Sequence, residues 1–581
     1  TLTGSTGNDT VAMSATQFGA LSTLNLGTGT NVLSVVAAGN ISALATPTVT
    51  NVTTGNLTGT GSDDTVTLTG AQLDAILVGT GTINLGAGTG DTINLTSTSA
   101  DLNALGATNV SITGVEAISA STAAAGILIT LFGQTEAFTI TGSSFADTIT
   151  GGTGADVIAA GGGNDTVNLA SGAFVAGESI DGGTGTDVVM LTNATIIDFT
   201  TGALTGVETL TGSTGNDTVT MAAALFAALS TLNLGTGTNV LSVLATGDIS
   251  ALATPTVTNV TTGNLTGTGG DDVVTLTGAQ LNAILVGSGT INLGAGTGDT
   301  INLTSTSTDL NTLGGTNASI AGVETISAAG AAASVTITLS SQTEGFTIIG
   351  SGFNDTLTGG SGTDIISGGA GNDTISGGGG TDQIRGGAGA DNLTGGGASD
   401  ILLYDTDTIG VIINLSANTA SGGDAQGDTI VTFENVYGGS GSDTLTGTNN
   451  ANILYGNNGN DIISGGGGAD TISGGAGSDT LTGGNGGDTF IFDSFTGTDT
   501  ITDYKTNQSD TLDISNLLTG FTAGVSDIDN FCQFQVSGGN TTVRIDVDGT
   551  ANGANFVSIA TLTGITTLVV QTLYDNGQII A

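Results

Sequence analysis

A nine-residue period constrains the fold of this chain more than any other feature of its sequence. Residues 359–396 read GGSGTDIISGGAGNDTISGGGGTDQIRGGAGADNLTGG, so a glycine pair, a third glycine, an aspartate and a large aliphatic residue return every nine positions. Glycine reaches positive φ angles and lets the backbone approach closely, so the glycine positions predict a sharp turn. The aliphatic residue at position 8 predicts a short strand with one inward side chain. Each nonapeptide therefore predicts half a coil of a β-solenoid.

Two nonapeptides complete one coil, so residues 18 apart should be neighbours in adjacent coils. We expect two rows of aspartates, Asp355, Asp373 and Asp391 on one edge and Asp364, Asp382 and Asp400 on the other. Carboxylates stacked at strand spacing, about 4.8 Å, repel one another, and a divalent cation between successive turns reverses that interaction. Carboxylate and carbonyl oxygens favour calcium over zinc or copper, while magnesium resists dehydration. The spacing therefore predicts multiple calcium ions.

The pattern G-G-x-G-x-D-x-U-x, with U a large aliphatic residue, resembles the repeat of RTX (repeats-in-toxin) calcium-binding β-roll proteins of the S-layer or cell-surface type. The resemblance implies an all-β fold, an elongated β-solenoid or parallel β-roll with few short helices, in several tandem segments. It implies that calcium is held by the aspartates Asp147, Asp156, Asp165, Asp187, Asp355, Asp364, Asp373, Asp382, Asp391, Asp400, Asp443, Asp461, Asp470, Asp479 and Asp488. It implies a part in the same sites for the turn glycines Gly359, Gly362, Gly368, Gly371, Gly377, Gly380, Gly386, Gly389, Gly438, Gly441, Gly465, Gly468, Gly474 and Gly477.

Some units depart from the repeat. Asn452 takes the aspartate position in GTNNANILY, and Ala398 replaces the third glycine in GGGASDILL. The sparser units before residue 200 are as compatible with a structural Asx turn as with a metal site. Asp9 and Asp217 lack the second glycine. The weakest candidates are Asp63, Asp64, Asp271 and Asp272.

A second, longer repeat organises the first half of the chain. TLTGSTGNDTV at 1–11 returns unchanged at 209–219, and the two prolines, Pro47 and Pro255, are likewise 208 residues apart. Stacking of like units is typical of solenoids. We expect the following segments: two β-rich copies at 1–208 and 209–354, RTX blocks at 355–403 and 438–491, spacer strands at 404–437 between them, and a C-terminal capping β-region with a secretion signal at 492–581.

Composition narrows the function. Fifty acidic residues face three basic ones, for a net charge of −47, which disfavours nucleic acid and anionic membrane surfaces as partners. The chain contains no run of 18 apolar residues, so direct membrane insertion is not expected. With no histidine it cannot build an HExxH zinc site, a Ser-His-Asp triad or a Cys-His pair, and we expect no enzymatic activity. Cys532 fits a small buried residue better than a catalytic thiol.

The C-terminal segment 486–518 resembles the capping strands that follow RTX blocks in proteins exported by type I secretion. This implies an extracellular or bacterial cell-surface location, with the secretion machinery as a partner. The start, TLTGSTGNDT, has no basic-then-apolar leader, so we expect a trimmed N-terminus or a preceding segment. Cytosolic calcium would leave weak sites empty, whereas millimolar calcium outside would fill them and drive folding.

Two non-enzymatic functions compete. A Thr-, Ala- and Gly-rich duplicated body with very few lysines predicts a protein that self-assembles into a surface layer or filament. The alternative is an adhesin or biofilm-matrix stalk. A calcium module of an enzyme whose catalytic region lies elsewhere is the third possibility.

Overall fold

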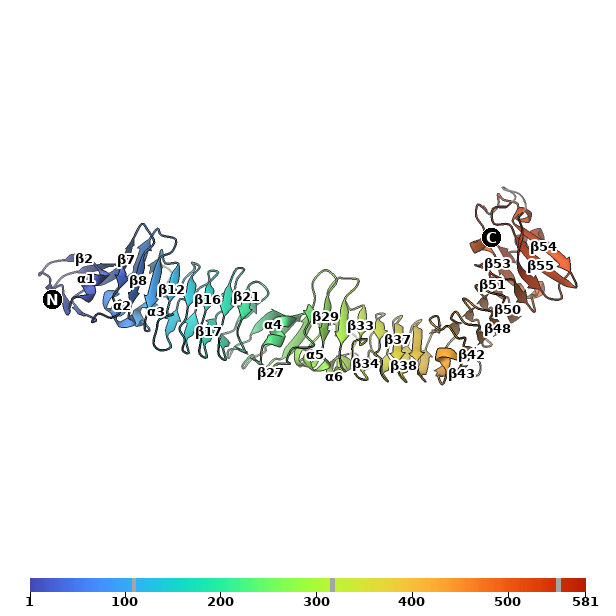
Figure 1. Ribbon diagram of the computed structural model, residues 1–581, viewed down its shortest axis with the longest axis horizontal. Helices are drawn as coiled ribbons and strands as arrows, with labels where there is room; N and C mark the ends of the chain where they lie inside the picture. Colours follow the sequence, from blue (N-terminus) through green and yellow to red (C-terminus); the bar gives the residue numbers. More distant parts are fainter. Residues whose placement is uncertain (107–110, 314–318, 550–554) are drawn as a thin grey trace. The chain divides into compact units, whose positions relative to one another are not determined.

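The computed structural model describes residues 1–106, 111–313, 319–549 and 555–581. The chain forms two compact units, the first comprising 1–268 with 282–292 and the second comprising 269–281 with 293–581. Within each unit, short parallel strands stack as the successive turns of a β-solenoid, as the strands around β16 and β37 illustrate (Figure 1). The predicted all-β solenoid is confirmed.

The first unit contains several parallel sheets. One runs through β8 (Thr65–Leu68), β10 (Thr92–Leu95), β12 (Ala117–Ser119), β14 (Thr139–Thr141), β16 (Val157–Ala159), β18 (Ser179–Asp181) and β21 (Ala203–Thr205). A second runs through β13 (Leu128–Thr130), β15 (Thr148–Thr150), β17 (Thr166–Leu169), β19 (Val188–Leu191), β22 (Thr209–Thr211), β24 (Thr231–Asn233) and β27 (Thr256–Thr258). A third includes β2 (Thr10–Ser14), β4 (Val32–Val36), β7 (Thr54–Thr60), β9 (Ile83–Gly86) and β11 (Ile112–Thr113).

The second unit holds the nonapeptide blocks in two sheets. The first contains β29 (Val273–Leu276), β31 (Thr300–Leu303), β33 (Thr325–Ser327), β35 (Thr347–Ile349), β37 (Ile365–Ala370), β39 (Gln383–Ala388), β41 (Ile401–Leu403), β45 (Asn435–Tyr437), β47 (Ile453–Tyr455), β49 (Thr471–Ser473), β51 (Thr489–Ile491) and β53 (Thr511–Asp513). The second contains β34 (Thr336–Thr338), β36 (Thr356–Thr358), β38 (Thr374–Gly378), β40 (Asn392–Gly396), β44 (Thr429–Val431), β46 (Thr444–Thr446), β48 (Ile462–Gly467), β50 (Thr480–Asn485) and β52 (Asp499–Ile501).

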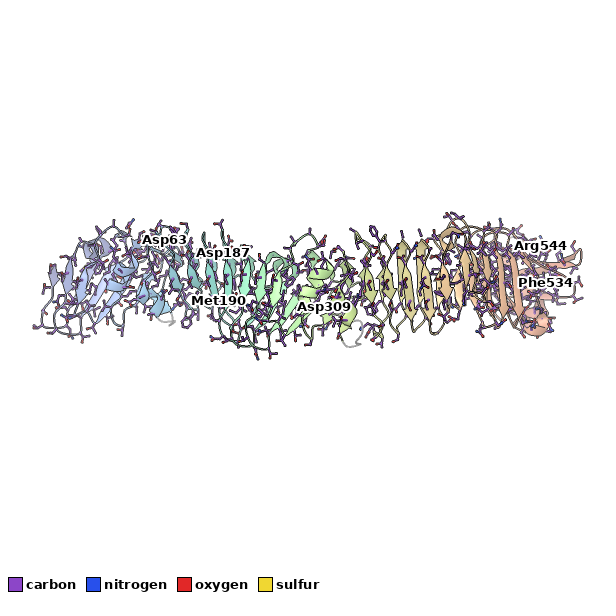
Figure 2. The ribbon with its side chains drawn as sticks, turned by 90° about the horizontal axis from the view of Figure 1, so that it is seen from below. Asp63, Asp187, Met190, Asp309, Phe534 and Arg544 are labelled. Atoms are coloured by element: carbon purple, nitrogen blue, oxygen red, sulfur yellow. The ribbon has the colours of Figure 1, made fainter. Side chains whose placement is uncertain are left out.

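The core is a stack of position-8 side chains. Ile348, Ile366, Ile384 and Leu402 are partners in successive strands, and each is at most 1% exposed. Burying one such side chain contributes about 1.5–3 kcal/mol. Neighbouring positions on a strand face the solvent, as Met190 of β19 does (Figure 2). The inward aliphatic residue of the repeat therefore builds the core as its spacing predicts.

Helices are short: α1 (Ala15–Gly19), α2 (Gly70–Ile76), α3 (Ala100–Gly106), α4 (Ala223–Ala228), α5 (Gly278–Ile284), α6 (Thr308–Leu313) and α7 (Val570–Asp575). Helix α1 begins with a capping box in which Ser14 and Gln17 satisfy each other's backbone N–H groups. Across the described ranges, no helix has the length and apolar character needed to cross a membrane.

Antiparallel pairing marks the spacer and the C-terminal region of the second unit. In the spacer, β42 (Ile412–Asn414) pairs antiparallel with β43 (Thr419–Ser421). Near the C-terminus, β54 (Cys532–Ser537), β55 (Asn540–Ile545) and β56 (Val557–Leu562) form an antiparallel sheet edge. Cys532 is 1% exposed, and burial raises the pKa of its thiol to about 12, which fits a packing role.

Candidate calcium sites

The aspartates of the first block form two hydrogen-bonded rows. The backbone N–H of each aspartate donates to Oδ1 of the aspartate 18 residues later, at 2.7–2.8 Å, giving Asp355–Asp373–Asp391 and Asp364–Asp382–Asp400. The same bond joins Asp443–Asp461–Asp479 and Asn452–Asp470–Asp488 in the second block. In the first unit it joins Asp147–Asp165–Asp187. The rows of the two RTX blocks lie where the 18-residue spacing predicts, whereas Asp165 and Asp187 of the first unit are 22 residues apart.

In each row that begins with an aspartate, this first aspartate sits in what we call a closed turn. There the backbone N–H of repeat position 2 donates to Oδ2, as Gly360 does to Asp364 and Gly439 to Asp443, both at 2.8 Å. The same contact satisfies Oδ2 of Asp147, Asp156 and Asp355. These carboxylates have the local backbone partner of an Asx-type turn.

Later aspartates of each row sit in what we call open turns. In these turns position 2 has a left-handed φ, for example 109° at Gly369 and 108° at Gly378. Within the described residues, Oδ2 is buried without a hydrogen-bond partner at Asp165, Asp187, Asp373, Asp382, Asp391, Asp400, Asp461, Asp470, Asp479 and Asp488. A buried carboxylate oxygen with no donor is costly unless a cation reaches it.

The open turns offer oxygens that suit calcium. A methyl group added at Gly368 would overlap Oδ2 of Asp373 and lie 2.6 Å from the carbonyl oxygen of Gly386 in the next coil. A methyl group added at Gly377 would likewise overlap Oδ2 of Asp382 and lie 2.6 Å from the carbonyl oxygen of Gly395. Position-1 glycine therefore leaves a cradle where a carboxylate and a carbonyl oxygen converge. Such hard oxygen ligands suit calcium.

Electrostatics at these turns favours a positive ion. Burial raises the pKa of Asp382 to about 7, and the carboxylates of Asp364 and Asp400 add to the shift. Burial likewise raises the pKa of Asp391 and of Asp461 to about 7. A cation in the cradle would offset both the desolvation and the mutual repulsion.

Comparison with protein families identifies the repeat that forms these turns. The RTX calcium-binding nonapeptide repeat matches residues 139–173, 203–220, 347–375, 376–407, 437–472, 455–490 and 464–501. The chain carries RTX calcium-binding repeats. Together with the parallel solenoid, the match confirms the predicted RTX β-roll and its calcium ions.

Solved structures include two similar chains. The AlgE6R3 subunit of the Azotobacter vinelandii mannuronan C5-epimerase is 29% identical over 22% of this chain and 73% of its own, with a TM-score of 0.18. The extracellular lipase LipA from Serratia marcescens is 19% identical over 49% of this chain and 45% of its own, with a TM-score of 0.17. No curated protein matches.

The acidic rows also include residues that the nonapeptide pattern misses. The N–H of Asp391 donates to Asp428, and that of Asp400 to Glu434, at 2.8 and 2.9 Å. Further rungs of this kind are Glu178, Glu208, Asp499 and Asp510. Each is followed two residues later by an inward aliphatic residue, so an acid-x-aliphatic signal without the glycines would have found them.

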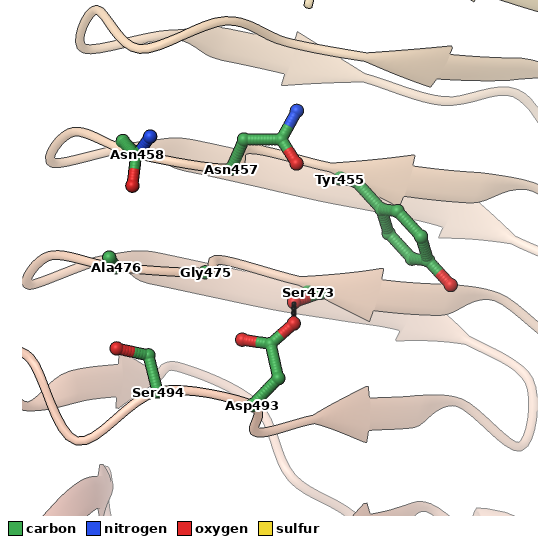
Figure 3. Close-up of a pocket in the computed structure, with 8 residues that line it drawn as sticks. All are labelled: Tyr455, Asn457, Asn458, Ser473, Gly475, Ala476, Asp493 and Ser494. Carbon is green, nitrogen blue, oxygen red and sulfur yellow. Dashed lines mark hydrogen bonds between the residues drawn. The ribbon is translucent and has the colours of Figure 1, made fainter. Parts of the chain in front are cut away.

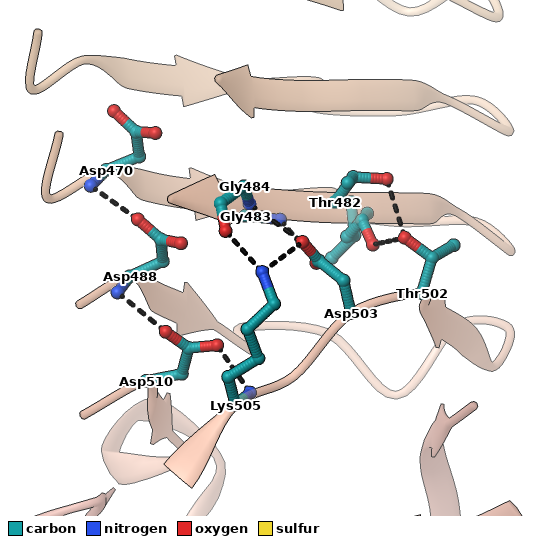
Figure 4. A network of polar contacts seen from close by, with 10 residues as sticks. Asp470, Thr482, Gly483, Gly484, Asp488, Thr502, Asp503, Lys505 and Asp510 are labelled. Carbon is teal, nitrogen blue, oxygen red and sulfur yellow. Dashed lines mark hydrogen bonds and ion pairs between the residues drawn. The ribbon is translucent and has the colours of Figure 1, made fainter. Parts of the chain in front are cut away.

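A lysine lies at the end of the last RTX row (Figure 4). Lys505 Nζ donates to the carbonyl oxygen of Gly484 and pairs with Asp503 at 3.3 Å. Asp503 in turn accepts the backbone N–H groups of Gly483 and Gly484, both at 2.9 Å. One of the chain's three basic side chains therefore places a hydrogen-bonded ammonium group beside the final turn.

Proposed function

We propose that this protein is an extracellular, calcium-dependent structural protein that self-assembles into a bacterial surface layer or filament. The observation that carries the proposal is the set of buried, unpartnered carboxylate oxygens in a chain of net charge −47. Without cations these rows repel, so type I export of an unfolded chain followed by folding in external calcium is coherent. We assign the chain no catalytic role.

Exposed apolar side chains support self-assembly. Phe145 and Phe353 occupy equivalent positions of the duplicated body and are 44% and 45% exposed. Val157 and Ile365, also 208 residues apart, are 47% and 45% exposed. Exposed apolar residues that recur at equivalent positions of the two copies offer other copies of the chain two like contact surfaces.

Calcium removal tests the folding part of the proposal. We expect strong β-type circular dichroism in millimolar calcium and a largely unfolded spectrum after EGTA, because the rows lose their counter-charge. Readdition of calcium should restore the β signal. An unchanged spectrum in EGTA would contradict the proposal.

Negative-stain microscopy tests the assembly part. Purified protein in calcium should form sheets or filaments, and Phe145→Ser with Phe353→Ser should weaken them while leaving the circular dichroism unchanged. Dispersed single particles from the unsubstituted protein would count against self-assembly and favour the adhesin.

One feature favours the adhesin alternative. A hollow of about 240 Å³ in the second unit is lined at one end by Tyr455 (Figure 3). The ring of Tyr455 stacks on that of Tyr437, with centroids 4.7 Å apart. The other residues that line the hollow are Asn457, Asn458, Ser473, Gly475, Ala476, Asp493 and Ser494. An aromatic ring beside amide, hydroxyl and carboxylate groups suits a small polar ligand such as a sugar.

The adhesin alternative predicts glycan binding that depends on this hollow. Ser473→Leu would fill it and should abolish retention on a glycan array. Ser367→Leu is the matched control, because Ser367 holds the same repeat position in the first block. Equal retention of both variants, or none by the unsubstituted protein, would exclude the hollow as the binding site.

A further inference from the structure

Among the acidic pairs, three in which the glutamate ends a G-V-E sequence lie at the margins of the RTX repeats or outside them. The backbone N–H of the aspartate donates to Oε2 of a glutamate one coil later, at 2.8 Å in every pair. We call them the Asp–Glu rungs: Asp91–Glu116 and Asp187–Glu208 in the first unit, and Asp299–Glu324 in the second. Only Glu208 falls within a segment that the RTX family model matches.

The aspartate of each rung is buried and only half satisfied. Asp91, Asp187 and Asp299 are 0%, 2% and 0% exposed. Oδ1 of each accepts a backbone N–H from the preceding coil, at 2.6–2.7 Å. Oδ2 of each has no hydrogen-bond partner among the described residues. The same orphaned oxygen therefore recurs in three separate coils.

In each rung the backbone turns at a glycine just before the glutamate, in a conformation that other residues rarely adopt. Gly114, Gly206 and Gly322 stand two residues before the glutamates and have φ of 58°, 60° and 59°. A side chain at Gly114 would overlap the carbonyl oxygen of Gly86, and one at Gly322 that of Gly294. The G-V-E sequence thus places a glutamate carboxylate oxygen 2.8 Å from the backbone nitrogen of the buried aspartate in every rung.

Solvent reaches the glutamate side of the rungs. Glu116, Glu208 and Glu324 are only partly buried, so an ion could enter and keep water ligands there. Two carboxylates match the charge of one divalent cation, and an oxygen-only ligand set selects a hard ion.

We propose that the three Asp–Glu rungs bind divalent cations, with calcium as the physiological ion. The duplicated body then holds two metal sites outside the nonapeptide pattern, at Asp91–Glu116 and Asp299–Glu324, and Glu208 adds a ligand to Asp187 within the pattern. This goes beyond the proposed function and holds whether the protein assembles or adheres.

Calcium stoichiometry of the full chain tests the proposal. The variant Glu116→Gln, Glu208→Gln, Glu324→Gln keeps an oxygen acceptor for each aspartate N–H but removes the three charges. By equilibrium dialysis against calcium alone, we expect it to bind three fewer ions per chain. The matched control is Glu136→Gln with Glu344→Gln, two exposed glutamates of the same body, and it should bind as many ions as the unsubstituted protein.

A second variant distinguishes a metal site from a buried aspartate that is neutral because it is protonated. Asp91→Asn with Asp299→Asn should bind two fewer ions, whereas protonated aspartates would leave the number unchanged. If the triple variant does not fold, Glu116→Gln alone should bind one fewer. Unchanged stoichiometry in folded glutamate or aspartate variants overturns the proposal, whatever the microscopy of assembly shows.

Discussion

At the scale of single residues, the second position of each turn decides the state of the aspartate. Where Gly378 adopts a left-handed φ, its N–H does not reach Asp382, and Oδ2 of Asp382 stays without a donor. Where Gly360 does not, its N–H donates to Asp364. Both turns carry the same glycine pattern, so local sequence does not separate them.

The difference arises 18 residues away. In the closed turn, Oδ1 of Asp364 accepts the N–H of Phe346, so Asp364 is the first aspartate of its row. In the open turn, Oδ1 of Asp382 accepts the N–H of another aspartate. The rows and the inward aliphatic residues were predictable from the nine-residue period. The turn state was not, because it depends on which residue the neighbouring coil presents.

Ala398 gives a residue-scale prediction. It occupies position 4 with φ of 80°, where glycine is the usual residue. Replacing it with glycine should stabilise the calcium-loaded fold by about 1 kcal/mol, because the left-handed region strains a residue with a Cβ. Chemical denaturation followed by circular dichroism would measure the change.

The control is Ala370→Gly, at position 3 of another turn and without a left-handed φ. It should destabilise by about 0.5–1 kcal/mol, since glycine adds backbone entropy there without relieving strain. Equal effects of the two substitutions would argue against strain at Ala398.

At the scale of elements, the hydrogen-bonded rows of acidic residues determine strand register more than the individual strands do. Strands of three residues, such as β36 (Thr356–Thr358), form in register because each is fixed by an aspartate N–H before it and an inward aliphatic residue within it. The sequence analysis placed this strand-and-turn rhythm correctly. It missed the glutamate rungs, because their turns lack the glycine pattern while the coil geometry still brings a carboxylate to the row.

The end of the last row gives an element-scale prediction. Lys505→Met should destabilise the turn at Gly483 and Gly484 by about 1 kcal/mol, since it removes a partly exposed ion pair and a hydrogen bond to a backbone carbonyl. Faster hydrogen exchange at these two amides would report the loss.

Arg385→Gln serves as the comparison. Arg385 pairs with Asp405 on the surface of the first block, where both side chains are about one-third exposed. Its removal should cost about 0–0.5 kcal/mol. A larger effect at Arg385 than at Lys505 would contradict a special role for the row end.

At the scale of the whole molecule, the rows couple folding to pH as well as to calcium. Burial raises the pKa of Asp373 and Asp470 from 3.8 to about 6, and that of Asp382, Asp391 and Asp461 to about 7. A raised folded-state pKa means that the folded form binds protons more tightly than the unfolded form. Each of these aspartates therefore stabilises the folded form fully below about pH 4, and this stabilisation is lost as the pH rises through 6 to 7.

Two opposite pH effects are therefore expected. In EGTA, lowering the pH from 7.5 to 5 should increase β content, because protons neutralise the buried rows. In calcium, the same change should raise the calcium concentration needed for half-folding, because protons compete for the carboxylates. Calcium titrations by circular dichroism at both pH values would show both effects. A calcium midpoint independent of pH would contradict them.

Every rung bond in these rows points the same way along the chain, from an amide to a carboxylate one coil further on. A cut across any row therefore creates two unlike faces, one with bare amide donors and one with bare carboxylate acceptors. Each face complements the other and repels or fails to engage its own kind. The two ends of each row are therefore chemically different, so a row has a direction along the chain as well as a length.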